Sequence, residues 1–426
     1  MPSNSASAAT RLVVFSDDWG RHPSSSQHLI GKLLADYDVV WVNTIGTRMP
    51  RLSLEDAQKI YVKLRQWTQP ADTAQVLPAR LSVLNPKMFP GFRQRWQRRV
   101  NAVLVSRALD TALGKRHSGE RRIGITTLPL TAGLIGRVDV DSWLYYCVDD
   151  FSVWPGLDGD VIDAMERDLV AKVDKVIAVS TTLQQRMAAM GKQAQLLTHG
   201  IDLDHWGSGL SAGLLDSEMP RPQSHDSQAP DGHLPGTDLP GVDTDDDTKP
   251  TCASEQPSWW PSTGPVLLFW GVVDKRLDVA WCRALANEVG SLVLVGPHQS
   301  PDPSLLAIPG ITLPGPIAYA QLPALARCAD VLVMPYDDLP VTRAMQPLKL
   351  KEYLATGRPS IVRSLPSTRG WDDTADVIES IEDLVRVARE RCANGIPMGH
   401  TEARARRLRG ETWAAKARAF EATFNV

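Results

Sequence analysis

Short runs of apolar residues recur along most of the chain and are separated by longer segments with helical periodicity. The runs lie at residues 11–15, 39–42, 123–126, 143–148, 176–179 and 196–198 in the first half, and at 266–270, 292–295, 311–313, 331–334 and 360–362 in the second. Many are continuously apolar rather than alternating. This pattern is typical of strands in parallel sheets that helices cover on both faces.

Helix-like segments at residues 27–36, 160–171 and 322–328 fall between these runs. Alternation of strands and helices on this scale predicts doubly wound α/β domains. A chain of 426 residues is too long for one core of ordinary size. We therefore predict two Rossmann-like domains, residues 1–206 and 264–410, that face each other across a cleft.

The segment between them, residues 207–263, is acidic and rich in Pro, Gly and Ser. It lacks a periodic apolar pattern, so it cannot bury enough surface to offset the entropy of ordering. We predict a largely disordered linker, with Trp259 and Trp260 docking on the second domain. A regulatory insert and a tolerated linker both fit, because long flexible insertions cost little stability.

Composition and charge narrow the class of protein. The 43% of hydrophobic and 22% of charged residues are ordinary for a globular protein, and the net charge of −3 gives no reason to expect nucleic acid binding. The five cysteines are not closely paired, so neither a disulfide framework nor a metal site is expected. No apolar run suits a signal peptide or a membrane span, and we expect a cytoplasmic protein.

One basic segment is relevant to where in the cell the protein works. Residues 91–102 combine four arginines with Phe92 and Trp96. Such a stretch fits peripheral contact with the inner face of an anionic membrane, and it fits a solvated helix face equally well.

Ligands of open α/β sheets bind beyond the carboxyl ends of the strands, so the loops there carry the candidate chemistry. The loop after the first run is small and polar and leads to His28, without the glycine patterns of dinucleotide or P-loop enzymes. The run at 143–148 ends in Asp149 and Asp150, followed by aromatic residues. Adjacent carboxylates suit recognition of sugar hydroxyls, and they also suit capping of the next element.

The second domain opens with Gly271 after an apolar strand, followed by Lys275 and Arg276. Glycine allows close approach of a ligand to the backbone, and the two cations can neutralise a diphosphate.

A helix is predicted from Pro347 to Gly357, because proline suits a first helical position and glycine a helix end. Its amino end, at Leu348, combines a positive dipole with the charge of Lys349 and predicts a diphosphate site. Glu352, one turn further, can accept two hydroxyl hydrogen bonds from a ribose.

Several segments in this order resemble the retaining GT-B glycosyltransferases. They are residues 176–180 and 199–202 at the end of the first domain, and 271–278, 294–297, 313–316, 330–334, 347–357 and 359–366 in the second. Residues 146–156 are similar to bacterial enzymes of the teichuronic-acid and exopolysaccharide type. The resemblance covers nearly all of the chain except residues 207–263.

The resemblance implies a transferase that moves a sugar, with retention, from a nucleotide diphosphate-sugar to a glycan or lipid-linked acceptor, without a metal or other cofactor. Arg276 and Lys349 would hold the diphosphate, and Glu352 would bind the ribose. His28 and the two aspartates would line the acceptor side, with Asp150 taking part in catalysis. Residues 411–426 would form a helix that crosses back onto the first domain.

One position departs from the family. Many relatives carry a glutamate eight residues before the ribose-binding one, where this chain has Ala344. The donor sugar therefore stays undetermined. A catalytically decayed sugar-binding or assembly protein, and a sugar-nucleotide epimerase of the same architecture, remain as alternatives.

Overall fold

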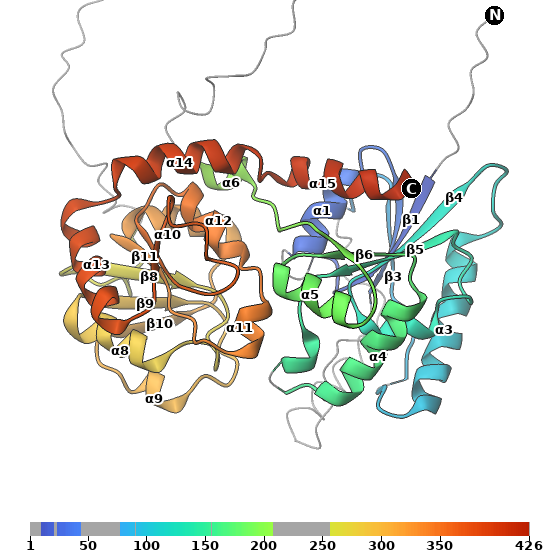
Figure 1. Ribbon diagram of the computed structural model, residues 1–426, viewed down its shortest axis with the longest axis horizontal. Coiled ribbons are helices and arrows are strands. Elements are labelled where there is room, and N and C mark those ends of the chain that lie inside the picture. Colours follow the sequence, from blue (N-terminus) through green and yellow to red (C-terminus); the bar gives the residue numbers. More distant parts are fainter. Residues whose placement is uncertain are drawn as a thin grey trace, which may run out of the picture.

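The computed structural model describes residues 10–20, 24–43, 77–89, 91–154, 156–207 and 256–425. Most of the predicted linker, residues 208–255, lies outside this part of the chain. The described residues form two lobes, each built on one parallel sheet (Figure 1). Trp260, just before the second sheet, is buried in the core of the second lobe.

The sheet of the first lobe has seven strands in the order β3-β2-β1-β4-β5-β6-β7, all parallel. They are β1 (Thr10–Ser16), β2 (Asp38–Asn43), β3 (Leu81–Leu84), β4 (Arg121–Thr126), β5 (Ser142–Cys147), β6 (Lys175–Ala178) and β7 (Ala194–Leu196). The central strands are buried along nearly their whole length, which accounts for their unbroken apolar runs.

Helices cover this sheet. They are α1 (Ser25–Leu33), α3 (Arg95–Leu113), α4 (Gly159–Lys172) and α5 (Thr181–Ala189), with the 3₁₀ turns η1 (Pro129–Gly133) and η2 (Phe151–Val153). Two of them begin at serine caps: the Ser24 hydroxyl accepts from the Gln27 amide, and the Ser180 hydroxyl accepts from the Leu183 amide. A short helix, α6 (Leu203–Trp206), follows the first sheet.

The sheet of the second lobe has six parallel strands in the order β10-β9-β8-β11-β12-β13. They are β8 (Val266–Trp270), β9 (Ser291–Val295), β10 (Ile311–Gly315), β11 (Val331–Met334), β12 (Ser360–Arg363) and β13 (Asp376–Ile378). In both sheets the order reverses beside the first strand of the lobe, which is the doubly wound topology. The predicted fold class is confirmed, although β3 and β13 were not predicted because they are short and only partly buried.

The helices of the second lobe are α8 (Val279–Glu288), α9 (Pro303–Leu306), α10 (Leu322–Cys328), α11 (Pro340–Ala344), α12 (Leu348–Ala355), α13 (Ile381–Asn394) and α14 (Met398–Arg409), with the 3₁₀ turn η5 (Tyr319–Gln321). The chain ends in α15 (Trp413–Glu421) and the 3₁₀ turn η6 (Ala422–Asn425). Figure 1 shows α14 along the second lobe and α15 continuing onto the first. Trp413 and Phe420 of α15 are buried in the core of the first lobe.

The chain passes between the lobes twice, and the two passages pair with each other. The Ile201 amide donates to the Glu411 carbonyl at 2.8 Å, and the Trp413 amide donates to the Ile201 carbonyl at 3.1 Å. Lys351 of α12 is fully buried beside them and donates to the His199 carbonyl and the Glu411 carboxylate. Lys351 thus connects α12 to both segments that link the two lobes.

Two expectations concern cysteine chemistry and membranes. Cys147, Cys282 and Cys392 have free thiols, whereas Cys328 is disulfide-bonded, so one cysteine is bonded although the sequence predicts no disulfide framework. Sequence spacing does not reveal sulfurs that meet only after folding.

No helix within the described ranges has the length and apolar character that crossing a bilayer requires.

Candidate active site

Two glycines meet where β8 and β9 end, at the carboxyl edge of the second sheet. Gly271 has φ +143° and donates its amide to the Val295 carbonyl at 2.8 Å. Gly296 has φ +141°, and a Cβ there would lie 1.8 Å from the Gly271 carbonyl oxygen. A Cβ at Gly271 would lie 2.5 Å from Cε of Lys349. Because neither glycine has a side chain, no Cβ covers the backbone at this edge. The aliphatic part of the Lys349 side chain lies directly against Gly271.

Lys349 comes from the first turn of α12 and is half-buried. Its Nζ lies 5.8 Å from the ring centroid of Phe269 and 5.6 Å from that of Tyr336. Before it, Gln346 and Pro347 are buried, whereas Leu348 is half-buried. The first amides of a helix have no acceptor within the helix, so the ammonium and the helix end can act on one anion.

Arg276 follows β8 on the same edge and has 6% of its surface exposed. Its Nε lies 3.0 Å from both carboxylate oxygens of Asp274, and its Nη2 lies 2.9 Å from one of them. The Trp154 ring of the first lobe lies over the guanidinium at 5.0 Å. Burial acts to lower the pKa of Arg276, but Tyr336 and Asp274 outweigh it and keep the group charged.

The burial of Arg276 changes the effect that we expect from replacing it with alanine. From the sequence alone, Arg276→Ala is expected to lower turnover far more than it disturbs folding. A buried arginine that neutralises Asp274 leaves an uncompensated charge when it is removed, at a cost of about 3–5 kcal/mol. We therefore expect Arg276→Ala to weaken folding as well as turnover.

Asp149 of the first lobe also faces this cationic edge. It lies two residues beyond Cys147, the last residue of β5, and its carboxylate interacts electrostatically with Arg276 and Lys349 of the other lobe. Burial raises the pKa of Asp149 to about 7, Arg276 and Lys349 oppose that rise, and Asp150 adds to it. The site thus joins two cations and a carboxyl that titrates near neutrality.

Asp150 points into its own lobe. Its carboxylate accepts from the Ser152 amide at 3.0 Å and the Ser152 hydroxyl at 2.5 Å, and it lies 3.5 Å from Nη1 of Arg186. It therefore caps η2 and pairs with α5. These contacts match the capping alternative, and its role in catalysis stays a prediction.

His28 and Lys275, two further predicted site residues, have other surroundings. The His28 ring stacks on Trp413 at 5.2 Å with an interplanar angle of 7°, and burial lowers the pKa of His28 although Asp202 opposes it. Lys275 is exposed. It interacts with Asp302, whose pKa is lowered mainly by its bonds to Ser304 and further by this lysine. Lys275 thus faces solvent, whereas Arg276, the next residue in the chain, is buried at the candidate site.

Glu352 occupies an aromatic pocket one turn along α12. Its two oxygens accept from the Trp270 indole at 2.9 Å and from the Tyr319 hydroxyl at 3.3 Å. Tyr319 in turn accepts from the Trp206 indole at 2.7 Å. Burial raises the pKa of Glu352, against the bond from Trp270 and the charge of Lys349. The carboxylate is thus held in one orientation beside the lysine.

Trp154 belongs to the aromatic residues that follow Asp150 in the sequence, but three other aromatic residues of the site were not predicted: Tyr319, Tyr336 and Trp206. Their spacing carries no signal, since each comes from a separate loop or short helix. Ala344 is buried, and its carbonyl accepts from the Ser180 hydroxyl of the first lobe at 2.7 Å. At the position where the family resemblance implies a glutamate, this chain makes an interlobe contact. Within the described residues, no group of three His, Cys, Asp or Glu side chains is placed to hold a metal ion.

Comparison with solved structures identifies the architecture. Sucrose-phosphate synthase from Thermosynechococcus elongatus matches with a TM-score of 0.65 and 14% identity over 98% of both chains. The protein has the GT-B fold. The E. coli trehalose-6-phosphate synthase bound with UDP-2-fluoro glucose matches with a TM-score of 0.60 and 12% identity, over 97% of this chain and 98% of that one.

A third structure of this fold holds a nucleotide. HepE from Anabaena, in complex with UDP and glucose, matches with a TM-score of 0.59 and 10% identity, over 97% of this chain and 99% of that chain. Identities this low bear on the fold alone.

A curated relative bears on function. The Bacillus subtilis (strain 168) protein described as a teichuronic acid biosynthesis glycosyltransferase, TuaH, is 33% identical over 111 residues. The match spans 25% of this chain and 28% of the length of that relative. No protein-family model matches the chain.

Proposed function

We propose that the protein is a hexosyltransferase-type glycosyltransferase that uses a nucleotide diphosphate-sugar donor and retains the configuration of the anomeric carbon. The observation that carries the proposal is that Lys349 lies against the backbone of Gly271 and that both the Lys349 ammonium and the Arg276 guanidinium lie by the Tyr336 ring, at the carboxyl edge of the second sheet. Neighbours of the same fold hold UDP or a UDP-sugar, which supports such a donor.

The donor would lie with its diphosphate between the amino end of α12 and the two cations. Negative charge grows on the leaving diphosphate as the bond to the sugar breaks. Fixed cations and helix amides stabilise that charge more in the transition state than in the ground state, which lowers the barrier. Arginine has five N–H donors, so Arg276 can bind a phosphate while it keeps Asp274.

Glu352 would bind the ribose hydroxyls. Trp270 and Tyr319 donate to its carboxylate and hold it in place, and each carboxylate oxygen has a second lone pair for a ligand. Asp149 would lie on the acceptor side of the diphosphate. Its raised pKa suits a group that exchanges a proton with an acceptor hydroxyl near neutral pH.

The acceptor in this proposal is a glycan or a lipid-linked glycan, and the pathway is the synthesis of a cell-surface polysaccharide. The match to the teichuronic acid relative supports this pathway. We propose that the protein works in the cytoplasm or at the inner face of the membrane, and that it needs no metal or other cofactor.

Calorimetry with nucleoside diphosphates tests the proposal. We expect UDP to bind the intact protein, and Lys349→Met to weaken that binding by about 10–100-fold, since a charge-assisted contact contributes about 1.5–3 kcal/mol. The matched control is Arg283→Ala, which removes an exposed charge from α8 in the same lobe. If a folded wild-type protein binds none of a panel of nucleoside diphosphates, the proposal fails and the decayed alternative gains support.

Incubation of the wild-type protein with a donor alone separates a transferase from an epimerase. An epimerase converts the sugar nucleotide without an acceptor. The proposed transferase leaves the donor sugar unchanged until an acceptor is added.

A further inference from the structure

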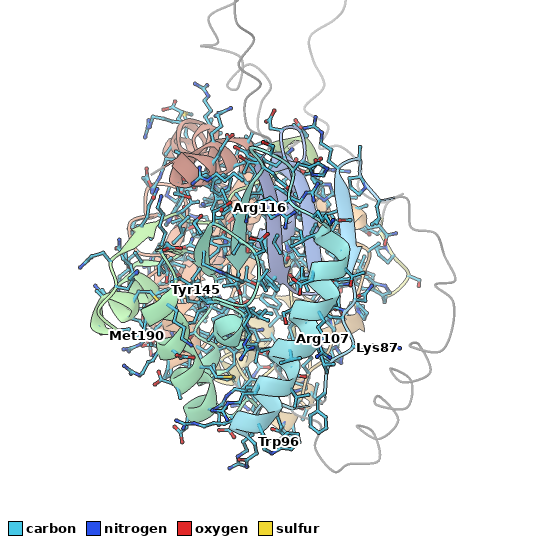
Figure 2. The ribbon with its side chains drawn as sticks, turned by 90° about the vertical axis from the view of Figure 1, so that its right-hand side faces the viewer. Lys87, Trp96, Arg107, Arg116, Tyr145 and Met190 are labelled. Atoms are coloured by element: carbon cyan, nitrogen blue, oxygen red, sulfur yellow. The ribbon has the colours of Figure 1, made fainter. Side chains whose placement is uncertain are left out.

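Helix α3 forms the outer wall of the first lobe. Figure 2 shows it on the face turned away from the second lobe, with Trp96 near one end, Arg107 further along and Lys87 beside it. Its inner side is buried against the sheet through Ala102, Val105 and Leu109. The other side faces solvent along the nineteen residues of the helix.

An apolar stripe runs along that solvent side. Trp96 has 53% of its surface exposed, Val100 40% and Leu104 37%. These residues are spaced by four, so they lie on one face of the helix. Phe89, which is 36% exposed, extends the stripe, because its ring centroid lies 5.0 Å from that of Trp96. Single exposed apolar residues are normal on a protein surface. Four that lie next to one another in the structure are typical of a contact surface.

Cations flank this stripe. Five basic residues in α3 or shortly before it are exposed: Lys87, Arg93, Arg95, Arg99 and Arg107. Arg93 forms an ion pair at 3.4 Å with Asp158, at the amino end of α4. One acidic residue of α3, Asp110, is exposed near its carboxyl end. The surface is therefore apolar along its centre and positive at its margins.

A small apolar cluster connects the start of α3 with the loop that follows β5. Phe92, just before the helix, packs with Ile162 and Met165 of α4 in a small apolar cluster, and Phe151 of η2 packs against that cluster. Phe151 lies two residues after Asp149 in the chain. The start of α3 and the loop that carries Asp149 are thus linked through this cluster.

We propose that the face formed by Phe89, Trp96, Val100 and Leu104, with its flanking cations, docks on an anionic lipid bilayer. An apolar stripe that carries tryptophan and is bordered by arginine is the arrangement of a helix lying in a membrane interface. The negative surface potential of anionic lipids attracts the cations. The docking stands on this surface alone, whereas delivery of a lipid-linked acceptor to Asp149 rests on the proposed function.

Sedimentation of the full chain with vesicles tests this proposal. We expect binding to phosphatidylcholine vesicles that contain phosphatidylglycerol, and little binding to vesicles of phosphatidylcholine alone. Trp96→Gln, Val100→Gln and Leu104→Gln combined should lower binding by about tenfold or more, because the apolar contact is lost. Arg95→Gln with Arg99→Gln should lower it and reduce its dependence on salt.

The matched control is Met398→Gln, which removes a residue that is 82% exposed at the start of α14 in the second lobe. It should leave vesicle binding unchanged. Unchanged binding of the stripe variant, or equal binding of the wild type to both kinds of vesicle, overturns the proposal. So does a wild type that ignores vesicles but self-associates through the stripe in sedimentation velocity, because the occupant is then a protein.

Calorimetry with UDP on the same samples separates the two proposals. A stripe variant that stays folded should bind UDP like the wild type. A wild type that binds UDP but no vesicles contradicts the docking alone, and one that binds vesicles but no nucleoside diphosphate contradicts the proposed function alone.

Discussion

The two lobes share a topology but build their strand-end loops differently. In the second lobe, Gly271 and Lys349 come from the end of a buried strand and the first turn of a helix, and they touch. In the first lobe, the neighbouring carboxylates of Asp149 and Asp150 diverge after β5. One interacts with the cations of the other lobe, and the other binds Ser152 and Arg186 within its own. Residues on rigid elements keep the relation that their sequence implies, whereas adjacent loop residues need not share a role.

The largest expected effect concerns the second lobe. Lys349→Met keeps most of the side-chain volume but removes the charge that faces the leaving group. We expect turnover to fall by about 10²–10³-fold, because loss of one preorganised contact costs about 2.7–4 kcal/mol of transition-state stabilisation. Release of nucleoside diphosphate from the donor measures the loss. If the variant keeps wild-type turnover, the lysine does not serve the leaving group.

A comparison of two glycines sharpens the role of the bare backbone. Gly271→Ala places a Cβ 2.5 Å from Lys349 Cε, whereas Gly315→Ala at the end of β10 adds a Cβ that meets nothing within 4 Å. Both glycines have positive φ, so both variants should lose about 1–3 kcal/mol of stability. We expect UDP affinity to fall by about tenfold only for Gly271→Ala, since it displaces the lysine. Urea unfolding and calorimetry measure the two effects. Equal UDP affinity in both variants would contradict close approach at Gly271.

Glu352 offers a test that depends on which part of the ligand is present. Glu352→Gln removes the charge while it preserves the shape of the side chain. We expect UDP affinity to fall by about tenfold, as for the loss of one charge-assisted contact, and pyrophosphate affinity to stay the same because that ligand has no ribose. Parallel calorimetry with both ligands provides the control. A similar loss for both ligands would place Glu352 at the phosphates instead.

The smallest effects concern the two aspartates. The pKa of Asp149 is raised from its ordinary 3.8 to about 7 in the folded protein. The stability that this carboxyl contributes is therefore complete below pH 3.8 and is lost as the pH rises through about 7. Asp149→Asn should flatten that decline in thermal unfolding midpoints measured between these pH values. An unaltered pH profile in the variant would show that Asp149 does not titrate near neutrality.

Asp150→Asn completes the comparison. It should cost about 0.5–2 kcal/mol in urea unfolding, because it weakens the cap of η2 and the pair with Arg186. UDP affinity should not change. A large loss of turnover without loss of stability would instead support the catalytic role that the sequence suggested for Asp150.

Much of the second-lobe site could be predicted from sequence because its determinants are local. Proline before and glycine after a periodic segment predicted α12 to within two residues at either end. The aromatic residues around Glu352 could not be predicted. Trp206, Trp270 and Tyr319 lie far apart in the chain. Only the folded structure brings the Trp270 and Tyr319 donors to the Glu352 carboxylate and the Trp206 indole to the Tyr319 hydroxyl.

The sequence by itself determined the two parallel sheets and the polar residues at their carboxyl edges, because continuous apolar runs and helix signals act over a few neighbouring residues. Only the tertiary structure decided which of these residues meet. Lys275 and Arg276 are adjacent, yet one is exposed and the other is buried beneath Trp154 of the other lobe. Side-chain direction, burial and interlobe contact depend on surfaces distant in the chain, and no local pattern encodes them.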